Sequence, residues 1–359
     1  MKPASIDELQ EIIRSQSCIA PLGGGSKSGL ATRADGVTQV SSAGLSGMLE
    51  YQPQEYTFTA LAGTRVAEVV SLLAEHGQYL MFDPLLVQAG ATLGGTVAAG
   101  LSGPGRYRFG GVRDALLGVR FVDGQGNLVR SGGKVVKNAA GFDLPKFMVG
   151  SLGSYGYMVE LSFKVMPSPA AWVSLRVRYP TLEAGLEALV LLTRLPLEIY
   201  SLDIGTEETG STVVVRLGGT ADSLPARLGR VQAALNNIQV DILEGDKEQE
   251  LWRAAVEFAW ILPGCSLVKV PLTPSRVLAL DRELGAHGAK RVYSVGANLG
   301  WVAWPGEVDA LDTILKQQEL SGLVILGAAG KARLGLRTGE SFARRVKQAL
   351  DPNGKFATL

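Results

Sequence analysis

The chain has 359 residues, of which 46% are hydrophobic and 19% charged, and its formal net charge at pH 7 is +1. This length is sufficient for two or three domains with cores of their own, and the composition is that of a folded rather than a disordered protein. A net charge so close to zero excludes general electrostatic binding of nucleic acid or of acidic membranes, so we expect recognition of charge to be local.

The sequence also lacks the usual signals for export and membrane insertion. Its first residues include acids and no apolar core that ends at a small-residue cleavage site, and no run of about 18 apolar residues occurs. Cys18 and Cys265 are too few for a disulfide framework and too isolated for a cysteine-ligated zinc or iron–sulfur site. We therefore expect a reduced, cytoplasmic protein with no transmembrane segment and no metal site.

The first predicted elements are a helix over 5–15, a short strand over 17–21 and a glycine-rich loop. The helix has apolar residues at helical spacing, and Ser5 and Glu8 predict a capping box at its start. Successive amides of the loop can converge on a phosphate, and Lys27 can add a positive charge. The common nucleotide-binding signatures are absent, so a tight turn after a strand remains an equal alternative. The loop comprises Gly23, Gly24, Gly25, Ser26, Lys27, Ser28 and Gly29.

A strand that starts at Tyr56 and a helix over 65–76 follow, with Gly77 as the predicted C-terminal cap. His76 then lies in the last turn of this helix, where we expect a structural role. The other histidine, His287, precedes Gly288 at the end of a later predicted helix, which favours a capping or surface role. The chain thus has few candidates for acid–base chemistry.

The stretch 90–156 is the most unusual part of the chain, because 17 of its 67 residues are glycine. Strand-like runs over 116–122 and 127–131 interrupt the glycines, which predicts folded backbone that approaches another group closely rather than a linker. Between 100 and 150, eight Lys or Arg residues stand against three acids. Small residues and a local positive excess favour a phosphate-bearing cofactor, although glycine-rich β-turns with solvated charges remain an alternative.

The second half of the chain alternates regularly between strands and helices after a predicted hinge at 166–169, which contains two prolines. The pattern predicts two β-α-β-β-α-β units in tandem, with a linking helix over 247–262 between them and a last helix over 339–350. Such a duplication predicts a continuous antiparallel sheet with helices on one face. The first unit has strands at 171–180, 197–204, 211–218 and 238–243 with helices at 181–195 and 221–237, and the second has strands at 266–272, 289–297, 300–305 and 323–328 with helices at 273–287 and 307–320.

Several of these segments, in this order and spacing, resemble the FAD-binding domain of the vanillyl-alcohol oxidase and p-cresol methylhydroxylase (PCMH) flavoproteins. Within that family, the short chain is most similar to the FAD-binding E subunits of bacterial glycolate oxidases. The resemblance is close over about 1–166 and looser over the second half and the tail DPNGKF. The matching segments are 23–29, 91–95, 102–103, 113–114, 137–143 and 150–153.

The resemblance implies an α+β fold: a PCMH-type FAD-binding domain over 1–166, with subdomains of about 1–88 and 89–166, and a ferredoxin-like cap domain over 170–335. Residues 336–359 would form a C-terminal helix and a tail that can return to the FAD domain. FAD would lie between the two subdomains, with its redox ring toward the cap.

The resemblance also implies which residues bind the cofactor. The first glycine loop would bind the FAD diphosphate through its amides, and the small residues of the later segments would let backbone approach the cofactor. An internal loop-bracing role for Asp143 is an equal alternative. The implied cofactor-binding residues are Gly23, Gly24, Gly25, Ser26, Lys27, Ser28, Ala91, Thr92, Gly94, Gly95, Ser102, Gly103, Lys137, Asn138, Gly141, Asp143, Gly150, Ser151 and Gly153.

Two departures from the family pattern shape the expected chemistry. Some relatives tether FAD through a histidine or cysteine, but the loop here offers Ser26, Lys27 and Ser28, so we expect non-covalent FAD. Catalytic relatives also carry a histidine-rich, metal-associated segment in the cap, whereas 294–301 reads SVGANLGW. No catalytic base can be assigned, and Arg106, Arg108 and Arg113 are equally suited to bind a substrate carboxylate, to bind the cofactor phosphates or to remain solvated.

The resemblance therefore implies an FAD-linked oxidoreductase that acts on CH–OH donors as a subunit of a glycolate oxidase complex. It would accept or relay electrons while glycolate, a 2-hydroxy acid, is oxidised to glyoxylate. Its partners would be a homologous FAD-containing catalytic subunit and an iron–sulfur subunit, with peripheral membrane association through them left open. Two alternatives remain: a stand-alone FAD oxidoreductase for a hydroxy acid or alcohol, which would use Tyr293, Lys269 or Arg291, and a flavin-stabilised assembly subunit without turnover.

Overall fold

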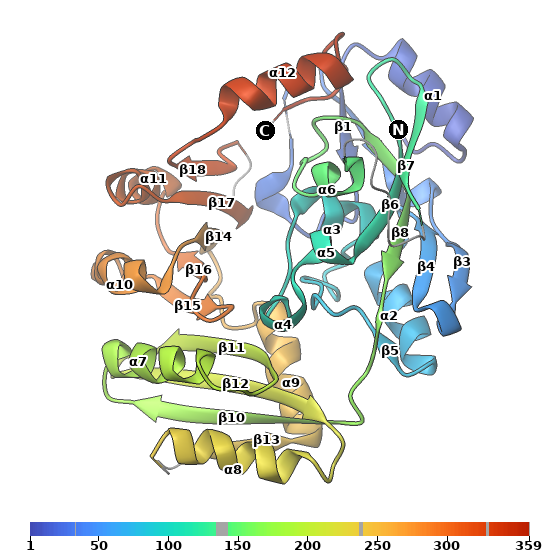
Figure 1. The fold of residues 1–359 in the computed structure, drawn as a ribbon. Helices are drawn as coiled ribbons and strands as arrows, with labels where there is room; N and C mark the ends of the chain where they lie inside the picture. Colours follow the sequence, from blue (N-terminus) through green and yellow to red (C-terminus); the bar gives the residue numbers. More distant parts are fainter. Residues whose placement is uncertain (33, 134–142, 237–239, 328–329, 359) are drawn as a thin grey trace. The chain divides into compact units, whose positions relative to one another are not determined.

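The computed structural model describes residues 1–32, 34–133, 143–236, 240–327 and 330–358 (Figure 1). Contacts divide the chain into two compact units. The first unit comprises 1–103, 110–168 and 337–359, and the second comprises 104–109 and 169–336. Residues 104–109, which the sequence-based boundaries assign to the N-terminal domain, thus group with the second unit. Among the described residues, no helix is both long and apolar enough to cross a membrane.

The first unit is built on an antiparallel sheet that, among the described residues, has five strands in the order β3-β4-β8-β6-β7. The strands predicted inside the glycine-rich stretch are confirmed as β6 and β7. Two smaller sheets accompany this one: β1 pairs in parallel with β2, and β5 pairs with β9. The bounds are β1 (Ile19–Leu22), β2 (Thr38–Ser41), β3 (Met48–Gln52), β4 (Thr57–Leu61), β5 (Gln78–Tyr79), β6 (Leu116–Val122), β7 (Leu128–Gly132), β8 (Tyr157–Lys164) and β9 (Met166–Pro167).

The helices of the first unit begin with the predicted α1, which buries Leu9 and Ile13. Its predicted capping box is half formed: the Ser5 hydroxyl accepts from the Glu8 N–H at 3.2 Å, but the Glu8 carboxylate accepts from the Ala4 N–H. The short helices α3, α5 and α6 were not predicted, because glycine-rich segments lack helical periodicity. The bounds are α1 (Ile6–Ser15), α2 (Val66–Glu75), α3 (Leu93–Ala99), α5 (Val112–Ala115), α6 (Leu144–Met148) and α12 (Glu340–Leu350), with 3-10 turns η1 (Ser28–Leu30), η2 (Ser42–Gly44) and η3 (Pro53–Glu55).

The second unit contains an antiparallel sheet with nine strands in its described residues, in the order β13-β10-β12-β11-β15-β16-β14-β17-β18. The order β13-β10-β12-β11 and the order β17-β14-β16-β15 have the same connectivity, so the predicted duplication of a ferredoxin-like unit is confirmed. The two copies join where Ile204 pairs with Tyr293. The bounds are β10 (Ala171–Tyr179), β11 (Ile199–Thr206), β12 (Ser211–Gly219), β13 (Asp241–Glu244), β14 (Ser266–Pro271), β15 (Lys290–Ser294), β16 (Leu299–Trp304), β17 (Ser321–Leu326) and β18 (Arg333–Gly335), the last of which was not predicted.

Helices cover both faces of this sheet, not one. Side chains of α7, α8, α10 and α11 share a hydrophobic core with alternate strand residues such as Val173 and Leu175. Ser174, between these two, points to the opposite face and accepts from the indole N–H of Trp252 on α9 at 2.8 Å. The bounds are α4 (Arg106–Phe109), α7 (Leu182–Thr193), α8 (Leu224–Ala234), α9 (Gly245–Val256), α10 (Val277–Ala286) and α11 (Val308–Gln317), with η4 at Pro274–Arg276. Helix α9 ends earlier than predicted, because Phe258 adopts a left-handed φ of +56°.

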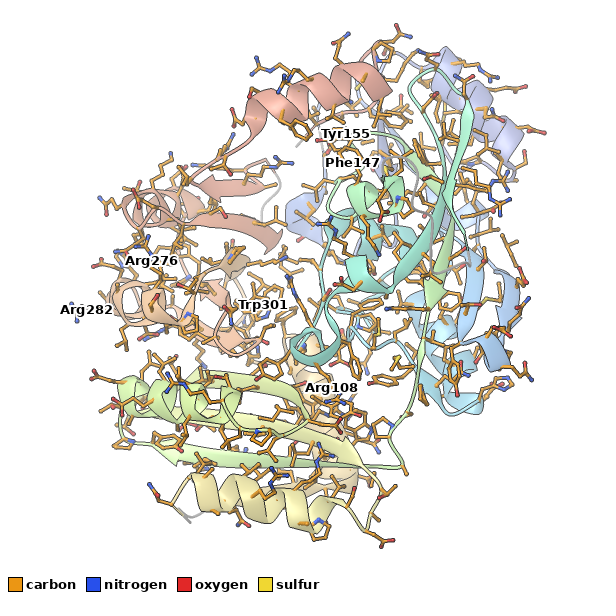
Figure 2. All side chains as sticks on the ribbon, viewed as in Figure 1. Arg108, Phe147, Tyr155, Arg276, Arg282 and Trp301 are labelled. Carbon is orange, nitrogen blue, oxygen red and sulfur yellow. The ribbon has the colours of Figure 1, made fainter. Side chains whose placement is uncertain are left out.

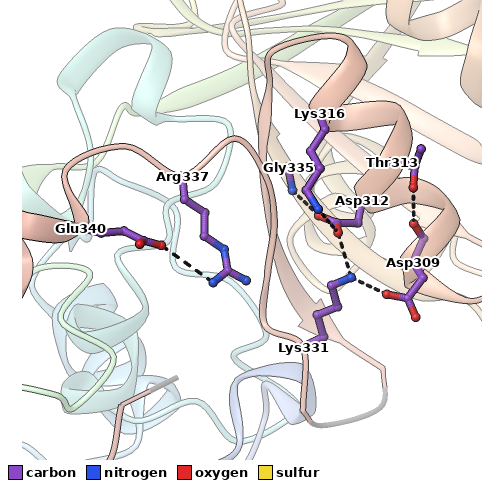
Figure 3. Close-up of polar contacts among 8 residues, drawn as sticks. All are labelled: Asp309, Asp312, Thr313, Lys316, Lys331, Gly335, Arg337 and Glu340. Carbon is purple, nitrogen blue, oxygen red and sulfur yellow. Dashed lines mark hydrogen bonds and ion pairs between the residues drawn. The ribbon is translucent and has the colours of Figure 1, made fainter.

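A carboxylate on α11 fastens the edge strand β18 to the second unit (Figure 3). Asp312 accepts from Lys316 and Lys331 at 2.8 Å each and from the Gly335 N–H at 2.6 Å. Burial alone would raise the pKa of Asp312, but these hydrogen bonds outweigh burial and hold the pKa well below its ordinary range. The neighbouring Asp309 also pairs with Lys331, yet its side chain is 77% exposed.

We expect Asp312→Asn to lower the free energy of unfolding at pH 7 by about 3 kcal/mol, because it removes the charge of a buried carboxylate that accepts hydrogen bonds from two cations and a backbone N–H. The pKa of Asp312 is depressed in the folded state, so its stabilisation is present above the unfolded carboxyl range and is lost as pH falls through the folded pKa. The difference in unfolding free energy between the native protein and Asp312→Asn should therefore become smaller as the pH falls. Urea denaturation at several pH values measures it, with the exposed Asp309→Asn as a control that should cost less than about 1 kcal/mol. Equal losses of unfolding free energy in Asp312→Asn and Asp309→Asn would contradict the stabilising role of the Asp312 hydrogen bonds.

Candidate cofactor-binding site

The first unit contains a cleft of about 370 Å³, a volume within the usual range for small-molecule sites. Segments distant in sequence form its walls: the loop after β1, the start of α3, the turn before β8 and the C-terminal tail. Many of the residues that the sequence assigns to cofactor binding line this cleft, namely Gly23, Gly24, Gly25, Ser26, Lys27, Ser28, Thr92, Gly94, Gly95 and Gly153.

The loop after β1 offers backbone donors to the cleft. Within the described part of the chain, the N–H groups of Gly24, Gly25 and Ser26 donate to no protein atom. Gly25 has a φ of +71°, and a Cβ placed on it would meet nothing within 4 Å. Successive unsatisfied amides beside open space form a cradle for an anion, and Lys27, whose ammonium lies 3.2 Å from the Ser26 hydroxyl, brings a positive charge.

The loop lies in direct backbone contact with the segment that precedes α3. A Cβ on Gly24 would lie 1.8 Å from the Gly90 carbonyl oxygen, and one on Gly23 would lie 2.6 Å from the Thr92 hydroxyl. The Arg65 guanidinium donates to the same Gly90 carbonyl, which adds a second positive group beside the loop. No motif marks Arg65, so sequence reasoning missed it.

The start of α3 supplies surface rather than donors to the cleft. The Gly94 N–H is already bonded to the Ala62 carbonyl at 2.8 Å, and the Gly95 N–H points to the capping hydroxyl of Thr92 at 3.3 Å. A Cβ on Gly94 would lie 2.9 Å from the Ala62 Cβ. The glycines here therefore allow close packing of the backbone, and because they have no side chains a large ligand can approach the backbone of α3.

The turn over 150–153 packs against the end of α3. The Gly150 N–H donates to the Val97 carbonyl at 3.0 Å, and the Leu152 N–H donates to the Ala98 carbonyl at 2.9 Å. Farther along, the ring of Tyr155 lies against that of Phe147 on α6, with centroids 4.8 Å apart (Figure 2). These contacts hold Leu152 and Gly153 at the cleft.

Other predicted site residues lie away from the cleft lining. The Ser102 hydroxyl accepts from the Val112 N–H at 2.9 Å, and the Gly103 N–H donates to the Asp83 carbonyl at 2.8 Å. Asp143 caps α6 by accepting from the Lys146 N–H at 3.1 Å, which is the loop-bracing role proposed as the alternative. Ala91, Gly150 and Ser151 are likewise outside the lining, and Lys137, Asn138 and Gly141 lie outside the described residues.

The cleft also includes residues that no sequence pattern indicated. The buried Ser42 hydroxyl borders the cleft and has no hydrogen-bond partner among the described residues, so it is suited to bind a polar ligand atom. Tyr157 contributes to the wall while its hydroxyl donates to the Val40 carbonyl at 3.2 Å, and burial raises the pKa of this phenol. Ala357 reaches the cleft from the opposite end of the sequence.

In the second unit, two of the candidate catalytic side chains belong to an internal cluster. Asp281 on α10 accepts two hydrogen bonds of 2.6 Å from Arg291 and one of 2.9 Å from the Tyr293 hydroxyl. Burial and the Asp281 charge raise the pKa of Tyr293, so this phenol is a poor base. Lys269 on β14 differs, because burial, with a smaller effect of the Arg106 charge, lowers its pKa to about 8.

Arg108 and the two histidines make structural contacts. Arg108, labelled in Figure 2, pairs with Glu198 at 3.0 Å and lies over the ring of Tyr200. His76 and His287 follow the last residues of α2 and α10 as C-caps, which confirms their predicted positions. Among the described residues, no group of three or more His, Cys, Asp or Glu side chains could hold a metal ion.

Comparison with known proteins relates this architecture to flavoproteins. A family model described as "FAD binding domain" matches residues 1–132. The glycolate oxidase subunit GlcE of Escherichia coli (strain K12) is 30% identical over 355 residues, which are 98% of this chain and 95% of that protein. The glycolate oxidase subunit GlcD of Bacillus subtilis (strain 168) is 26% identical over 192 residues, 52% of this chain and 41% of that protein.

A solved structure of alkyldihydroxyacetonephosphate synthase shares the fold. It superposes with a TM-score of 0.72 at 14% identity and covers 99% of this chain and 74% of that chain. The likeness extends over both units, so the predicted combination of a PCMH-type domain with an α+β cap is confirmed at the level of the fold.

We expect Gly24→Ala to disrupt the loop, because its new Cβ would lie 1.8 Å from the Gly90 carbonyl oxygen and backbone atoms must move apart. The loss of stability should be about 1–3 kcal/mol. The purified variant should also retain less bound flavin than the native chain. Thermal unfolding and the ratio of flavin to protein absorbance measure the two effects.

The matched control is Gly229→Ala on α8, where an added Cβ meets nothing within 4 Å. Because this glycine lies inside an exposed helix, the control should gain up to about 1 kcal/mol and keep its flavin. A Gly24→Ala variant with native stability and flavin content would show that the loop does not depend on this contact.

Proposed function

The chain belongs to the family of the glycolate oxidase subunit GlcE, and we propose that it is the FAD-carrying subunit of a complex that oxidises glycolate, a 2-hydroxy acid, to glyoxylate. The observation that carries the proposal is the similarity to GlcE over 95% of that protein's length. The match includes both units, so it concerns more than a shared FAD-binding domain.

FAD fits the cleft of the first unit by the chemistry of the residues present. The amides of Gly24, Gly25 and Ser26, which have no partner among the described residues, suit a diphosphate, and Lys27 and Arg65 offset its charge. The Ser42 hydroxyl, which has no hydrogen-bond partner in the described part of the chain, is suited to a polar atom of the ligand. When bound, FAD supplies a hydride acceptor, which the amino-acid side chains cannot provide.

The binding of FAD is proposed to be non-covalent. The described residues that line the cleft include no histidine and no cysteine, the side chains that tether flavin in some relatives. Both cysteines of the chain, Cys18 and Cys265, are free and lie outside this lining.

Oxidation of a 2-hydroxy acid also requires a base for the hydroxyl proton and a cation for the carboxylate. Tyr293 and Arg291 are engaged with Asp281, and the segment 294–301 contains neither histidine nor acid. We therefore assign these roles to a homologous FAD-containing catalytic subunit, with an iron–sulfur subunit as a further partner. A cytoplasmic location, with membrane contact only through partners, completes the proposal.

One observation favours the stand-alone oxidoreductase as a second candidate. Lys269, with a pKa of about 8, would be largely neutral in mildly alkaline solution and could then accept a proton. This candidate requires turnover by the isolated chain.

The two candidates differ in an anaerobic mixing experiment. We expect glycolate to leave the flavin absorbance of the isolated chain unchanged and to bleach it once the partner subunits are added. Bleaching of the isolated chain by glycolate or another 2-hydroxy acid would instead support the stand-alone enzyme, and Lys269→Met should then abolish it. Absence of bleaching under both conditions would leave only an assembly role.

Precipitation of the yellow protein with acid tests how the cofactor is held. We expect the yellow colour to remain in the supernatant, because the described cleft lining includes no histidine and no cysteine. The supernatant should contain FAD by its fluorescence after phosphodiesterase treatment. Colour that stays in the pellet would show a covalent bond.

A further inference from the structure

The C-terminal tail over 351–358 forms part of the wall of the cleft. We propose that this tail, which we call the clasp, strengthens FAD binding when it is docked, and that bound FAD in turn stabilises the docked clasp. The inference rests on the proposed function in one respect, namely that FAD occupies this cleft. Ala357 is the tail residue that lines the cleft. Its position depends on three sets of contacts.

The tail extends the small sheet that leads to the glycine loop. Phe356 pairs in parallel with Ile19 on β1: the Ile19 N–H donates to the Lys355 carbonyl at 2.7 Å, and the Ala357 N–H donates to the Ile19 carbonyl at 2.9 Å. The Phe356 side chain is buried in the same hydrophobic cluster as Ile19 and Tyr157. Docking of the tail therefore fixes the strand from which the loop begins, four residues later.

A second set of contacts joins the tail to the end of α1. The Lys355 ammonium donates to the Arg14 carbonyl at 3.0 Å and to the Gln16 carbonyl at 2.6 Å. Carbonyls at the end of a helix have no partner within the helix, and a cation satisfies them well. Lys355 thus ties the tail to the helix that precedes β1.

The third set is a buried ion pair that shapes the turn between α12 and the tail. The Asp351 carboxylate, whose side chain is 0% exposed, accepts from the Lys355 and Phe356 N–H groups at 2.8 Å each and from the Lys347 ammonium at 2.5 Å. Lys347 also donates to the Phe356 carbonyl at 2.6 Å and to the Ser154 carbonyl at 2.7 Å.

The contact with Ser154 links the clasp to a second wall of the cleft. Ser154 follows Gly153, which lines the cleft on the turn before β8. One ammonium group therefore holds the tail and this turn together. A tail that leaves its place removes Ala357 from the wall and takes away one set of contacts from β1 and one from the turn.

Such an arrangement predicts reciprocal coupling. If the cleft is complete only when the tail is docked, then FAD must stabilise the docked tail by the same factor by which the docked tail strengthens FAD binding. The coupling acts through the protein's own residues and does not depend on turnover.

The full-length variants Ala357→Trp and Thr358→Trp test the clasp. The first places a large ring at the cleft wall, and the second places the same ring on an exposed neighbour. Titration of the flavin-free proteins with FAD, followed by flavin fluorescence, should show at least a tenfold higher Kd for Ala357→Trp. The Kd of Thr358→Trp should stay within twofold of the native value, and both proteins should melt at the native temperature without FAD.

A second measurement follows the tail directly. Carboxypeptidase digestion of the native protein should slow at least fivefold when FAD is added, and Asp351→Asn should raise the rate of digestion and weaken FAD binding. A native chain that binds no FAD would refute the proposed function. If the native chain binds FAD, two results would each overturn the proposed coupling between the clasp and FAD. One is an unchanged Kd for Ala357→Trp, and the other is digestion that FAD does not slow.

Discussion

The approach of the Gly24 backbone to the Gly90 carbonyl is the contact on which the cleft depends. No side chain fits between these atoms, since a Cβ on Gly24 would lie 1.8 Å from the oxygen. Arg65 binds the same carbonyl and holds it in place. In this position of the loop, the amides of Gly24, Gly25 and Ser26 have no partner among the described residues. The contact between Gly24 and Gly90 therefore leaves these N–H groups available to a ligand beside the loop.

Polar groups serve two purposes in this chain: some border the cleft and remain available, and others, such as the buried Asp351–Lys347 pair of the first unit, satisfy one another. In the first unit, the Ser42 hydroxyl and the loop amides border the cleft and remain available. In the second unit, charged groups satisfy one another: Asp281 binds Arg291 and Tyr293, and the buried Glu248 binds Arg216 at 2.8 Å. Breaking such a pair costs stability, because the partner of the carboxylate would be left as a buried charge without compensation. The available donors beside the cleft are consistent with a chain that carries a cofactor.

Much of the fold was predictable because its signals are local. The helix α1 and the duplicated ferredoxin-like unit follow from side-chain periodicity, which reports directly on a half-buried helix or strand. The end of α9 was predicted wrongly, because apolar residues continue to 262 although the backbone leaves the helix at Glu257. Strand β18 was missed, since it is held by the distant Asp312 rather than by a pattern of its own.

For the site, local sequence patterns indicated the glycine loop and the small residues of α3, because tight turns and close backbone approach require glycine. The folded chain shows which of these residues share a cleft, and in it Asp143 caps a helix and Ser102 binds a backbone N–H. It also added Ser42, Arg65 and Ala357, whose types are ordinary and whose positions in the chain are far apart. Chain folding brings such residues together through nonlocal pairing, as between Ile19 and Phe356, and no local pattern encodes that proximity.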